Sequence, residues 1–332
     1  MRQRVGLIEA LGLRPLGPTL RAALLTFAGD EHTPPSRFDL SSLRQLRPRY
    51  ALPLWLGGSP CGRRVPITNL FNHRQPPPEH GWSVRVTQVL DFRGGGNTYD
   101  SHNGTDLAVP PGTQVVAAAP GVVLRVSSEF NRGGRKIFLD HGRGLATSYN
   151  HLSRPLVQPG QQVARGEVIA LSGYSGIDAL TTFPWTPPHV HMNVWLNGCY
   201  VDPFARPGEA SLWRSGNDPA PYRGQPGRDP DDLAFSPTRF EQAAIKFIAS
   251  CCRHADSRAE ILGATTQTER AGAALMHLSY YPSRFVAGTT AAILYGETFV
   301  RQSRLDLPFS AEDYDGVFFP ERGPAIPPVA GE

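Results

Sequence analysis

The stretch Thr-Pro-Pro-His-Val-His-Met-Asn-Val at positions 186–194 places two histidines one residue apart, directly behind a pair of prolines. The residues that follow are those of a hydrophobic strand. In an extended strand, positions i and i+2 face the same side, so His189 and His191 should lie next to each other on one face. Two such imidazoles can provide one metal ligand and one acid/base group, or two metal ligands.

Three more residues of metal-binding or acid/base type lie upstream. His102 and Asp106 belong to the stretch His-Asn-Gly-Thr-Asp at 102–106, and His151 belongs to Ser-Tyr-Asn-His-Leu at 148–152. Imidazole and carboxylate are the hard and borderline ligands that zinc accepts. Three ligands with two spare imidazoles match the composition of a hydrolytic zinc site.

Short β-branched runs surround these residues, beginning after Trp82. Turn-forming residues separate them, namely the glycines at 94–96, the Pro-Gly pair at 120–121 and the glycines at 133–134. Short strands at such close spacing predict a sheet sandwich or barrel. The segments 120–123 and 159–170 are similar to the half-motifs of biotinyl/lipoyl-like hammerhead domains, a similarity of fold that says little about chemistry.

The chain has 332 residues, more than a typical single domain, so several regions are expected. We expect an irregular N-terminal extension at 1–80 with one helix near 19–27, and the β-rich domain at 81–205. A linker rich in proline and glycine should follow at 206–235, and a small α-helical region at 236–332. Helices are expected after Ser236, over about 257–278, and over 285–300.

Composition favours no nucleic-acid partner. The net charge is only +4, and the positive residues form no clustered stripe. The four cysteines show no CxxC spacing and do not fix the redox compartment. Charged residues and Pro15 interrupt every apolar run of residues 5–27, so we expect neither a signal peptide nor a transmembrane segment. Oligomeric state is left open.

The order and spacing of the motifs resemble the LytM/lysostaphin-type zinc metallopeptidases over roughly 84–203. The resemblance includes the two histidine motifs, the Asp-His-Gly turn at 140–142 and the Leu-Ser-Gly stretch at 171–173. It implies a duplicated hybrid motif, that is, an antiparallel β-sandwich. It also implies that Zn²⁺ is bound by His102, Asp106 and His191, with His151 and His189 as catalytic histidines that bind no metal.

The same resemblance suggests smaller roles for three neighbours and one departure from the family. Tyr99 is a possible auxiliary donor to the oxyanion, His141 a packing residue near the site, and Asn193 a residue that lines the cleft or hydrogen-bonds a ligand. The loop 174–188 is longer and more apolar than is usual in the family. We expect this loop, with Phe183 and Trp185, to line the cleft.

Three functions compete at this point. The resemblance favours a zinc metalloendopeptidase that cuts peptidoglycan cross-links, which would place it in the envelope or outside the cell. One alternative is a non-catalytic regulator of other wall hydrolases, although the intact ligands argue against it. The other is a histidine phosphoryl-carrier module, which would have no use for Asp106.

Overall fold

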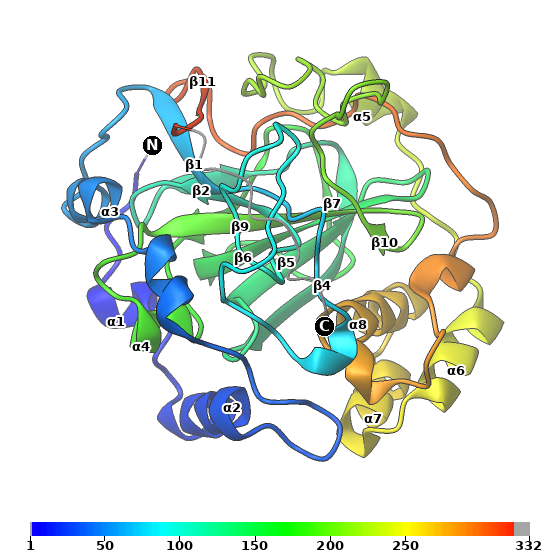
Figure 1. Ribbon diagram of the computed structural model, residues 1–332. Helices are drawn as coiled ribbons and strands as arrows, with labels where there is room; N and C mark the ends of the chain where they lie inside the picture. The colour runs from blue at the N-terminus through cyan, green and yellow to red at the C-terminus, as the bar shows by residue number, and fades with distance from the viewer. Residues whose placement is uncertain (1, 322–332) are drawn as a thin grey trace.

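The computed structural model describes residues 2–321, and its centre is one large β-sheet with helices around it (Figure 1). The mainly β fold expected from the sequence is confirmed. The α-helices are α1 (Leu7–Ala10), α2 (Leu16–Ala28), α3 (Pro48–Trp55), α4 (Asp178–Thr181), α5 (Pro230–Ala234), α6 (Gln242–Cys251), α7 (Ala255–Gly263) and α8 (Gln267–Tyr280). The short 3-10 helices are η1 (Leu40–Gln45), η2 (Pro78–His80), η3 (Pro282–Arg284) and η4 (Ala291–Leu294).

The strands form one hydrogen-bonded network in the order β11-β1-β2-β9-β6-β5-β4-β7, with β3, β8 and β10 attached beside this path. Their bounds are β1 (Arg64–Asn69), β2 (Thr105–Ala108), β3 (Gln114–Val116), β4 (Gly121–Glu129), β5 (Gly134–Asp140), β6 (Leu145–Pro155), β7 (Gln162–Val163), β8 (Val168–Ser172), β9 (His189–Leu196), β10 (Cys199–Tyr200) and β11 (Gly316–Phe318). The pairs are antiparallel except β1 with β11, which is parallel. Segments on either side of the β-rich region, β1 and β11, are therefore part of the same sheet.

The central strand β9 shows how the sheet divides its two faces. Val190, Met192 and Val194 point into the main hydrophobic core. The alternate residues point to the opposite face, where Trp195 belongs to a second core. This alternation is the period of two that a strand imposes on its side chains. His189, His191 and Asn193 lie on the same side as Trp195.

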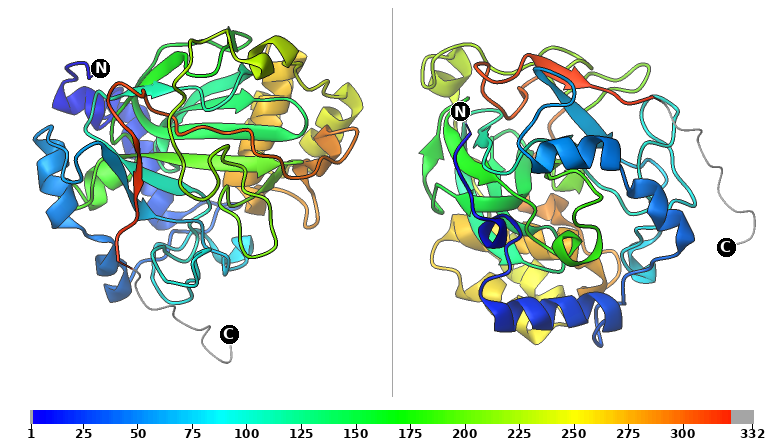
Figure 2. Two further views of the ribbon diagram at one scale, coloured as in Figure 1. Left: turned by 90° about the horizontal axis from the view of Figure 1, so that it is seen from above. Right: turned by 90° about the vertical axis from the view of Figure 1, so that its left-hand side faces the viewer.

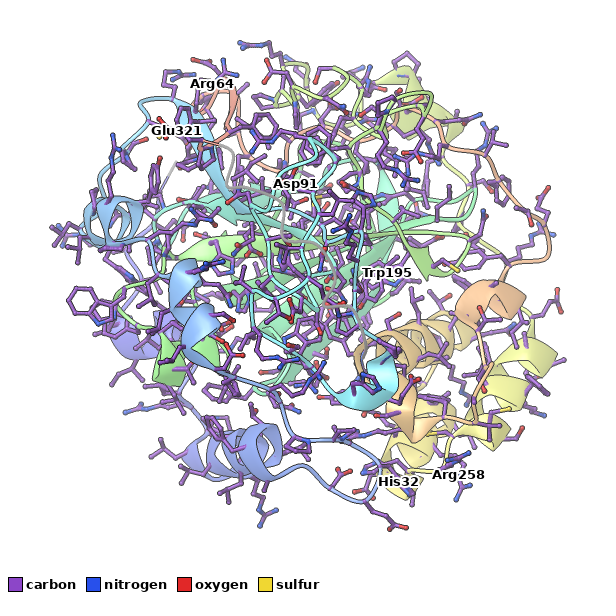
Figure 3. All side chains as sticks on the ribbon, viewed as in Figure 1. His32, Arg64, Asp91, Trp195, Arg258 and Glu321 are labelled. Carbon is purple, nitrogen blue, oxygen red and sulfur yellow. The ribbon has the colours of Figure 1, made fainter. Side chains whose placement is uncertain are left out.

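The second core joins the sheet to the C-terminal helices. Trp195, labelled in Figure 3, packs against Phe138 of β5 with ring centroids 5.6 Å apart, and helices α6, α7 and α8 contribute the rest of this core. Both views of Figure 2 show these helices gathered on one side of the sheet. Full burial of a large apolar side chain stabilises a fold by about 1.5–3 kcal/mol, so this layer is firmly attached.

The C-terminal region is helical, as expected, but its helices differ from the predicted ranges. The predicted helix at 257–278 is two helices, α7 and α8, because Thr266 begins a new one with a capping box to Glu269. No α-helix forms over 285–300, where only the short η4 is present. Gly288, Gly296 and the pair Thr289-Thr290 explain this, since glycine and threonine are poor helix formers.

The flanks of the β-rich region contain more regular structure than the sequence suggests. The predicted helix at 19–27 is observed as α2, but the segment 1–80 also contains α1, α3 and strand β1. In the segment 206–235, Trp213 is fully buried in the main core, and α5 follows it. Within the described part of the chain, no helix has the length and apolar character that a membrane span requires.

Candidate metal centre

Antiparallel pairing of β2 with β9 brings the two histidine motifs together. The register places Asp106 opposite His191 and Ala108 opposite His189. His102 approaches from the loop before β2, and the intervening Gly104 makes this possible. A Cβ atom on Gly104 would lie 2.7 Å from Nε2 of His191, closer than atoms pack.

His102, Asp106 and His191 converge as a group that could hold a metal ion. Nδ1 of His191 lies 2.7 Å and Nε2 of His102 lies 3.0 Å from Oδ1 of Asp106, and the two nitrogens are 3.1 Å apart. All three side chains are buried, and their ligand atoms lie within 4.8 Å of one another. Two nitrogens and one carboxylate oxygen at such distances suit zinc with a fourth position left for water.

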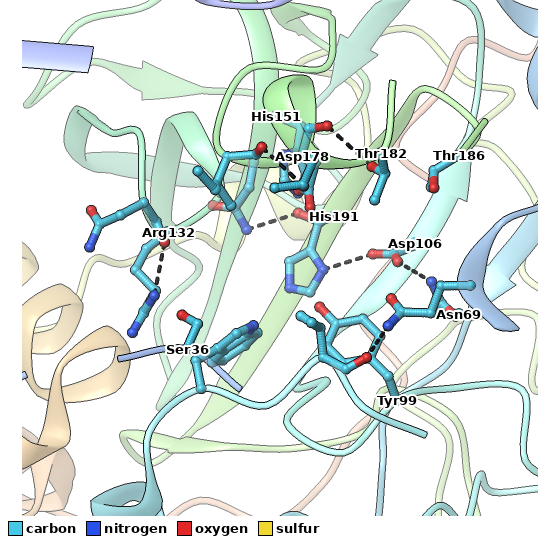
Figure 4. A pocket seen from close by; sticks show the side chains of 18 of the residues that line it. Ser36, Asn69, Tyr99, Asp106, Arg132, His151, Asp178, Thr182, Thr186 and His191 are labelled. Carbon is cyan, nitrogen blue, oxygen red and sulfur yellow. Dashed lines mark hydrogen bonds and ion pairs between the residues drawn. The ribbon is translucent and has the colours of Figure 1, made fainter. Parts of the chain in front are cut away.

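Neighbouring groups fix the orientation of two of these side chains, and the contact between Asn69 and Asp106 is visible in Figure 4. Nδ1–H of His102 donates to the Leu70 carbonyl at 2.7 Å, which turns Nε2 of the ring towards Asp106. Nδ2–H of Asn69 donates to Oδ2 of Asp106 at 2.8 Å, which leaves Oδ1 for the cluster. Both contacts come from the end of β1, and such outer contacts tune ligand affinity.

Burial and mutual charge decide the protonation of the cluster. Burial alone would raise the pKa of Asp106, but the charges of His102 and His189 and hydrogen bonds from His102 and His191 lower this pKa well below its ordinary value. Burial lowers the pKa of His191 to about 4 despite the neighbouring Asp106. At neutral pH, Asp106 is therefore a carboxylate and His191 a neutral imidazole. These are the protonation states in which the two side chains bind metal.

His151 and His189 lie beside this cluster, and each ring is held by a hydrogen bond from Nδ1–H to a backbone carbonyl. Their ring centroids are 4.7 Å apart. Nδ1–H of His151 donates to the Ser175 carbonyl at 2.8 Å, and Nδ1–H of His189 donates to the Pro187 carbonyl at 2.8 Å. In this tautomer each Nε2 keeps a lone pair, and both side chains line the same pocket.

His151 is the more constrained of the two. Its backbone has φ of 60°, a left-handed conformation that is unusual for histidine and often found at functional sites. Burial, followed by the charges of His189 and His191, lowers the pKa of His151 well below its ordinary value. A neutral imidazole at this position can accept a proton.

The remaining predicted neighbours separate into two groups. Tyr99 lines the pocket, with its ring 4.6 Å from that of His102, and Nε2 of His191 lies 2.9 Å from Nδ2 of Asn193. His141 lies outside the pocket lining and is held by the Pro120 carbonyl and the Thr147 hydroxyl, at 2.8 Å each. His141 therefore packs inside the fold.

The long loop lines the pocket, but not through the aromatic residues expected from the sequence. Asp178 and Thr182 are among the residues from this loop that face the pocket. Phe183 instead packs against Trp55 of α3, with ring centroids 4.8 Å apart, and Trp185 is half exposed. The expectation that Phe183 and Trp185 line the cleft was wrong, because α3 offers Phe183 an apolar partner that the local sequence does not reveal, and Trp185 lies at the surface.

Sequence reasoning missed several pocket residues that come from distant segments. Asn69 lies on β1, Arg132 in the turn between β4 and β5, Asp178 on α4, and Tyr280 at the end of α8. The Tyr280 hydroxyl donates to Oδ1 of Asn193 at 2.6 Å, which connects the helical layer to the site. None of the four belongs to a local motif with zinc-ligand spacing, so no signal marked them.

Comparisons of the sequence with known proteins identify relatives that are peptidases. Residues 100–203 match the description "Peptidase family M23". An uncharacterized metalloprotease of Haemophilus influenzae is 43% identical over 112 residues, which are 33% of this chain and 22% of that protein. The peptidoglycan DD-endopeptidase ShyA of Vibrio cholerae is 39% identical over 97 residues, which are 29% of this chain and 21% of ShyA.

A crystal structure of a zinc-containing peptidase from Vibrio cholerae is 30% identical, with a TM-score of 0.31 over 42% of this chain and 38% of the other. The similarity to the two curated relatives spans only about a fifth of their length. The segment that matches the family, residues 100–203, contains the four histidines and the aspartate of the site. Residues 100–203 of this chain are therefore a peptidase domain of family M23, the LytM/lysostaphin family.

Proposed function

We propose that this chain is a zinc-dependent endopeptidase that hydrolyses peptide cross-links of bacterial peptidoglycan. The observation that carries the proposal is the buried group of His102, Asp106 and His191 with two further imidazoles at its side. The relative ShyA is named a peptidoglycan DD-endopeptidase, which supports the choice of substrate.

The proposed metal ligands are Nε2 of His102, Oδ1 of Asp106 and Nδ1 of His191. These three atoms already face one another, and Leu70 and Asn69 hold two of the side chains from behind. Zinc, when bound, lowers the pKa of a water and polarises a substrate carbonyl. The donor set fits a catalytic rather than a structural site, because three protein ligands leave one position open.

His151 and His189 are the proposed acid/base residues. Each has Nδ1–H engaged by a backbone carbonyl, so Nε2 is the atom that can exchange a proton in the pocket. One imidazole would take the proton of the attacking water and return it to the leaving amine. The other, with the Tyr99 hydroxyl, would donate to the oxygen that becomes negative.

The decisive experiment measures metal and activity on the same preparation. We expect about one zinc per chain by elemental mass spectrometry, and release of un-cross-linked stem peptides from purified peptidoglycan by liquid chromatography. A chelator should abolish both, and added zinc should restore both. Zinc without any cleavage of peptidoglycan would contradict the proposal and favour a non-catalytic regulator.

A further inference from the structure

Arg132 is a buried cation without an anionic partner beside the proposed metal centre. Its side chain is 8% exposed and it lies in the turn between β4 and β5. Nη1 donates to the Asn131 carbonyl at 2.9 Å. Among the described residues, Nε has no acceptor and no carboxylate forms an ion pair with the guanidinium. Glu129, at the end of β4, pairs with Lys136 instead, at 2.9 Å.

Two aromatic rings hold the guanidinium in place without neutralising it. Cζ of Arg132 lies 5.6 Å from the ring centroid of Trp82 and 5.6 Å from that of Tyr281. The Tyr281 hydroxyl in turn donates to Oδ1 of Asn131 at 2.9 Å. The other arginine on Tyr281, Arg284, does have a carboxylate partner in Asp30, at 3.3 Å. Of the two arginines that contact Tyr281, Arg132 is therefore the one without a carboxylate partner among the described residues.

The position of Arg132 connects two cavities. It lines the pocket of the metal centre, where Figure 4 shows it on the other side of His191 from Asp106. It also lines a second cavity of about 1450 Å³, counted to its open mouth, between the proline-rich segment 76–78 and the end of α8. Trp82, Asn103 and Tyr280 line both cavities as well. A ligand that occupied both cavities would therefore have Arg132 beside it in each.

The turn that carries Arg132 is tied to a proposed catalytic residue. The backbone N–H of His151 donates to the Gly133 carbonyl at 2.8 Å. Gly133 and Gly134 both have positive φ, so the turn is one that other residues would strain. This rigid connection holds the guanidinium at a set place relative to the reacting groups.

A buried cation is costly unless an anion pairs with it. Burial lowers the pKa of the Arg132 guanidinium, which fits the lack of a nearby carboxylate. Arginine binds carboxylates through two parallel hydrogen bonds, which gives direction as well as affinity. Peptides offer this group at acidic side chains and at the C-terminus.

We propose that Arg132 binds a carboxylate of the substrate peptide at the junction of the two cavities, and so selects acidic peptides. This inference rests on the proposed function. It adds that the peptide runs from the metal centre towards the second cavity, with its carboxylate a short way from the bond that is cut.

The test compares two forms of one cross-linked peptide dimer, one with free carboxylates and one with carboxamides in their place. In the zinc-loaded full chain we expect the carboxylate form to have a kcat/KM about tenfold to a hundredfold higher, the range of a hydrogen bond to a charged group. Arg132→Gln should bring the two forms within about threefold of each other, and Arg132→Lys should lie between, since lysine keeps the charge without the fork.

Arg239→Gln is the matched control, because Arg239 is an exposed arginine outside both cavities and its loss changes the net charge equally. Thermal melting of each variant checks that it is folded. A carboxylate preference that survives in Arg132→Gln would place the carboxylate on the metal and overturn the inference, as would equal rates for both forms in the unmodified chain.

The same peptide pair separates this inference from the proposed function. If neither form is cut, the endopeptidase assignment fails, and titration calorimetry then measures binding without turnover. Tighter binding of the carboxylate form that disappears in Arg132→Gln would still support the role of Arg132. Equal binding of both forms would refute it.

Discussion

At the level of single residues, the proposed ligands and the proposed acid/base histidines should behave differently when removed. We expect His191→Ala and Asp106→Ala to lose zinc and activity together, because a site with three ligands rarely retains metal with two. His151→Ala and His189→Ala should keep zinc and slow hydrolysis by roughly a hundredfold or more. Metal content and rate, measured on each variant, decide between the two classes. Loss of zinc from His189→Ala would reverse the assigned roles of His189 and His191.

Asn69 offers a finer test of the same site. Its side chain donates a hydrogen bond to Oδ2 of Asp106, so Asn69→Ala should weaken zinc binding by about 10–100-fold without removing a ligand. Competition with a chromogenic chelator measures this change. Asn217→Ala is a suitable control, since Asn217 bonds only to Ala205 on the surface. Unchanged zinc affinity in Asn69→Ala would mean that Asp106 is oriented by other groups.

His141 should make stability depend on pH. Burial lowers its pKa from the ordinary 6.5 to about 3 in the folded chain. The unfolded chain takes up this proton below about pH 6.5, so the stability that neutral His141 contributes is present above pH 6.5 and is lost as the pH falls towards 3. We expect the free energy of unfolding to fall by roughly 1 kcal/mol per pH unit from this group.

Urea denaturation of chelator-treated protein between pH 4 and 7 measures that slope. His141→Gln should show a shallower slope than the unmodified chain, with other titrating groups common to both. Parallel curves for the two proteins would show that folding does not lower the pKa of His141.

Much of the candidate site was predictable because several of its residues lie close together in the sequence, in short motifs. His102 and Asp106 are four residues apart, and His189 and His191 are two apart, so their spacing is visible in the sequence. Arg132 and Tyr280 are brought in by tertiary packing from turns and helices with no recognisable spacing. Their positions depend on long-range contacts that no local pattern encodes, such as the hydrogen bond between Tyr280 and Asn193, which are 87 positions apart.

At the level of elements, the docking of α8 onto β4 can be tested at Gly272. A Cβ atom there would lie 2.9 Å from both the Cβ and the carbonyl oxygen of Leu124. Alanine normally stabilises a helix by about 1 kcal/mol relative to glycine. We expect Gly272→Ala to destabilise the protein by roughly 1–2 kcal/mol instead, since overpacking costs more than propensity gains. Chemical denaturation measures the difference.

Gly263 in α7 is the matched control, because a Cβ atom there would meet nothing within 4 Å. Gly263→Ala should be neutral or stabilise the protein by up to about 1 kcal/mol. Equal effects at both positions would show that helix propensity, and not the approach of α8 to the sheet, determines the role of Gly272.

These glycines also show why element boundaries were harder to predict than element types. From sequence alone, Gly263 and Gly272 both weaken a helix prediction to the same degree. In the structure, one lies near a break between two helices, and the other allows a helix to touch a strand. The distinction lies in what faces each glycine, and this is set by the fold as a whole.

At the level of the whole molecule, the predicted domain boundary at 81–205 remains a prediction that the contacts make testable. A fragment of these residues lacks β1, with the Leu70 carbonyl and Asn69 that hold the ligands, and it lacks the buried Trp213. We expect this fragment to unfold at lower urea concentration than the full chain and to bind zinc more weakly. Equal midpoints and equal zinc affinity would show that 81–205 is an independent domain.

The mainly β architecture was predictable because short β-branched runs with glycine turns repeat along 84–203. The parallel pairing of β1 with β11 was not, because it joins residues about 250 positions apart and neither strand is longer than six residues. The flanks contribute to the sheet through such long-range contacts. A sequence reading that treats them as appendages underestimates how much of the molecule supports the site.

The alternation along β9 has a consequence for how this domain can change over generations. If the proposed site is correct, substitutions at 190, 192 and 194 should act mainly on folding, whereas substitutions at 189, 191 and 193 should act mainly on chemistry. Selection could then tune one property with little effect on the other. An insertion of a single residue within β9 would exchange the two sets, since a shift of one position turns each side chain to the opposite face. Such length changes should therefore be absent from viable variants, while point changes on either side are tolerated to different degrees.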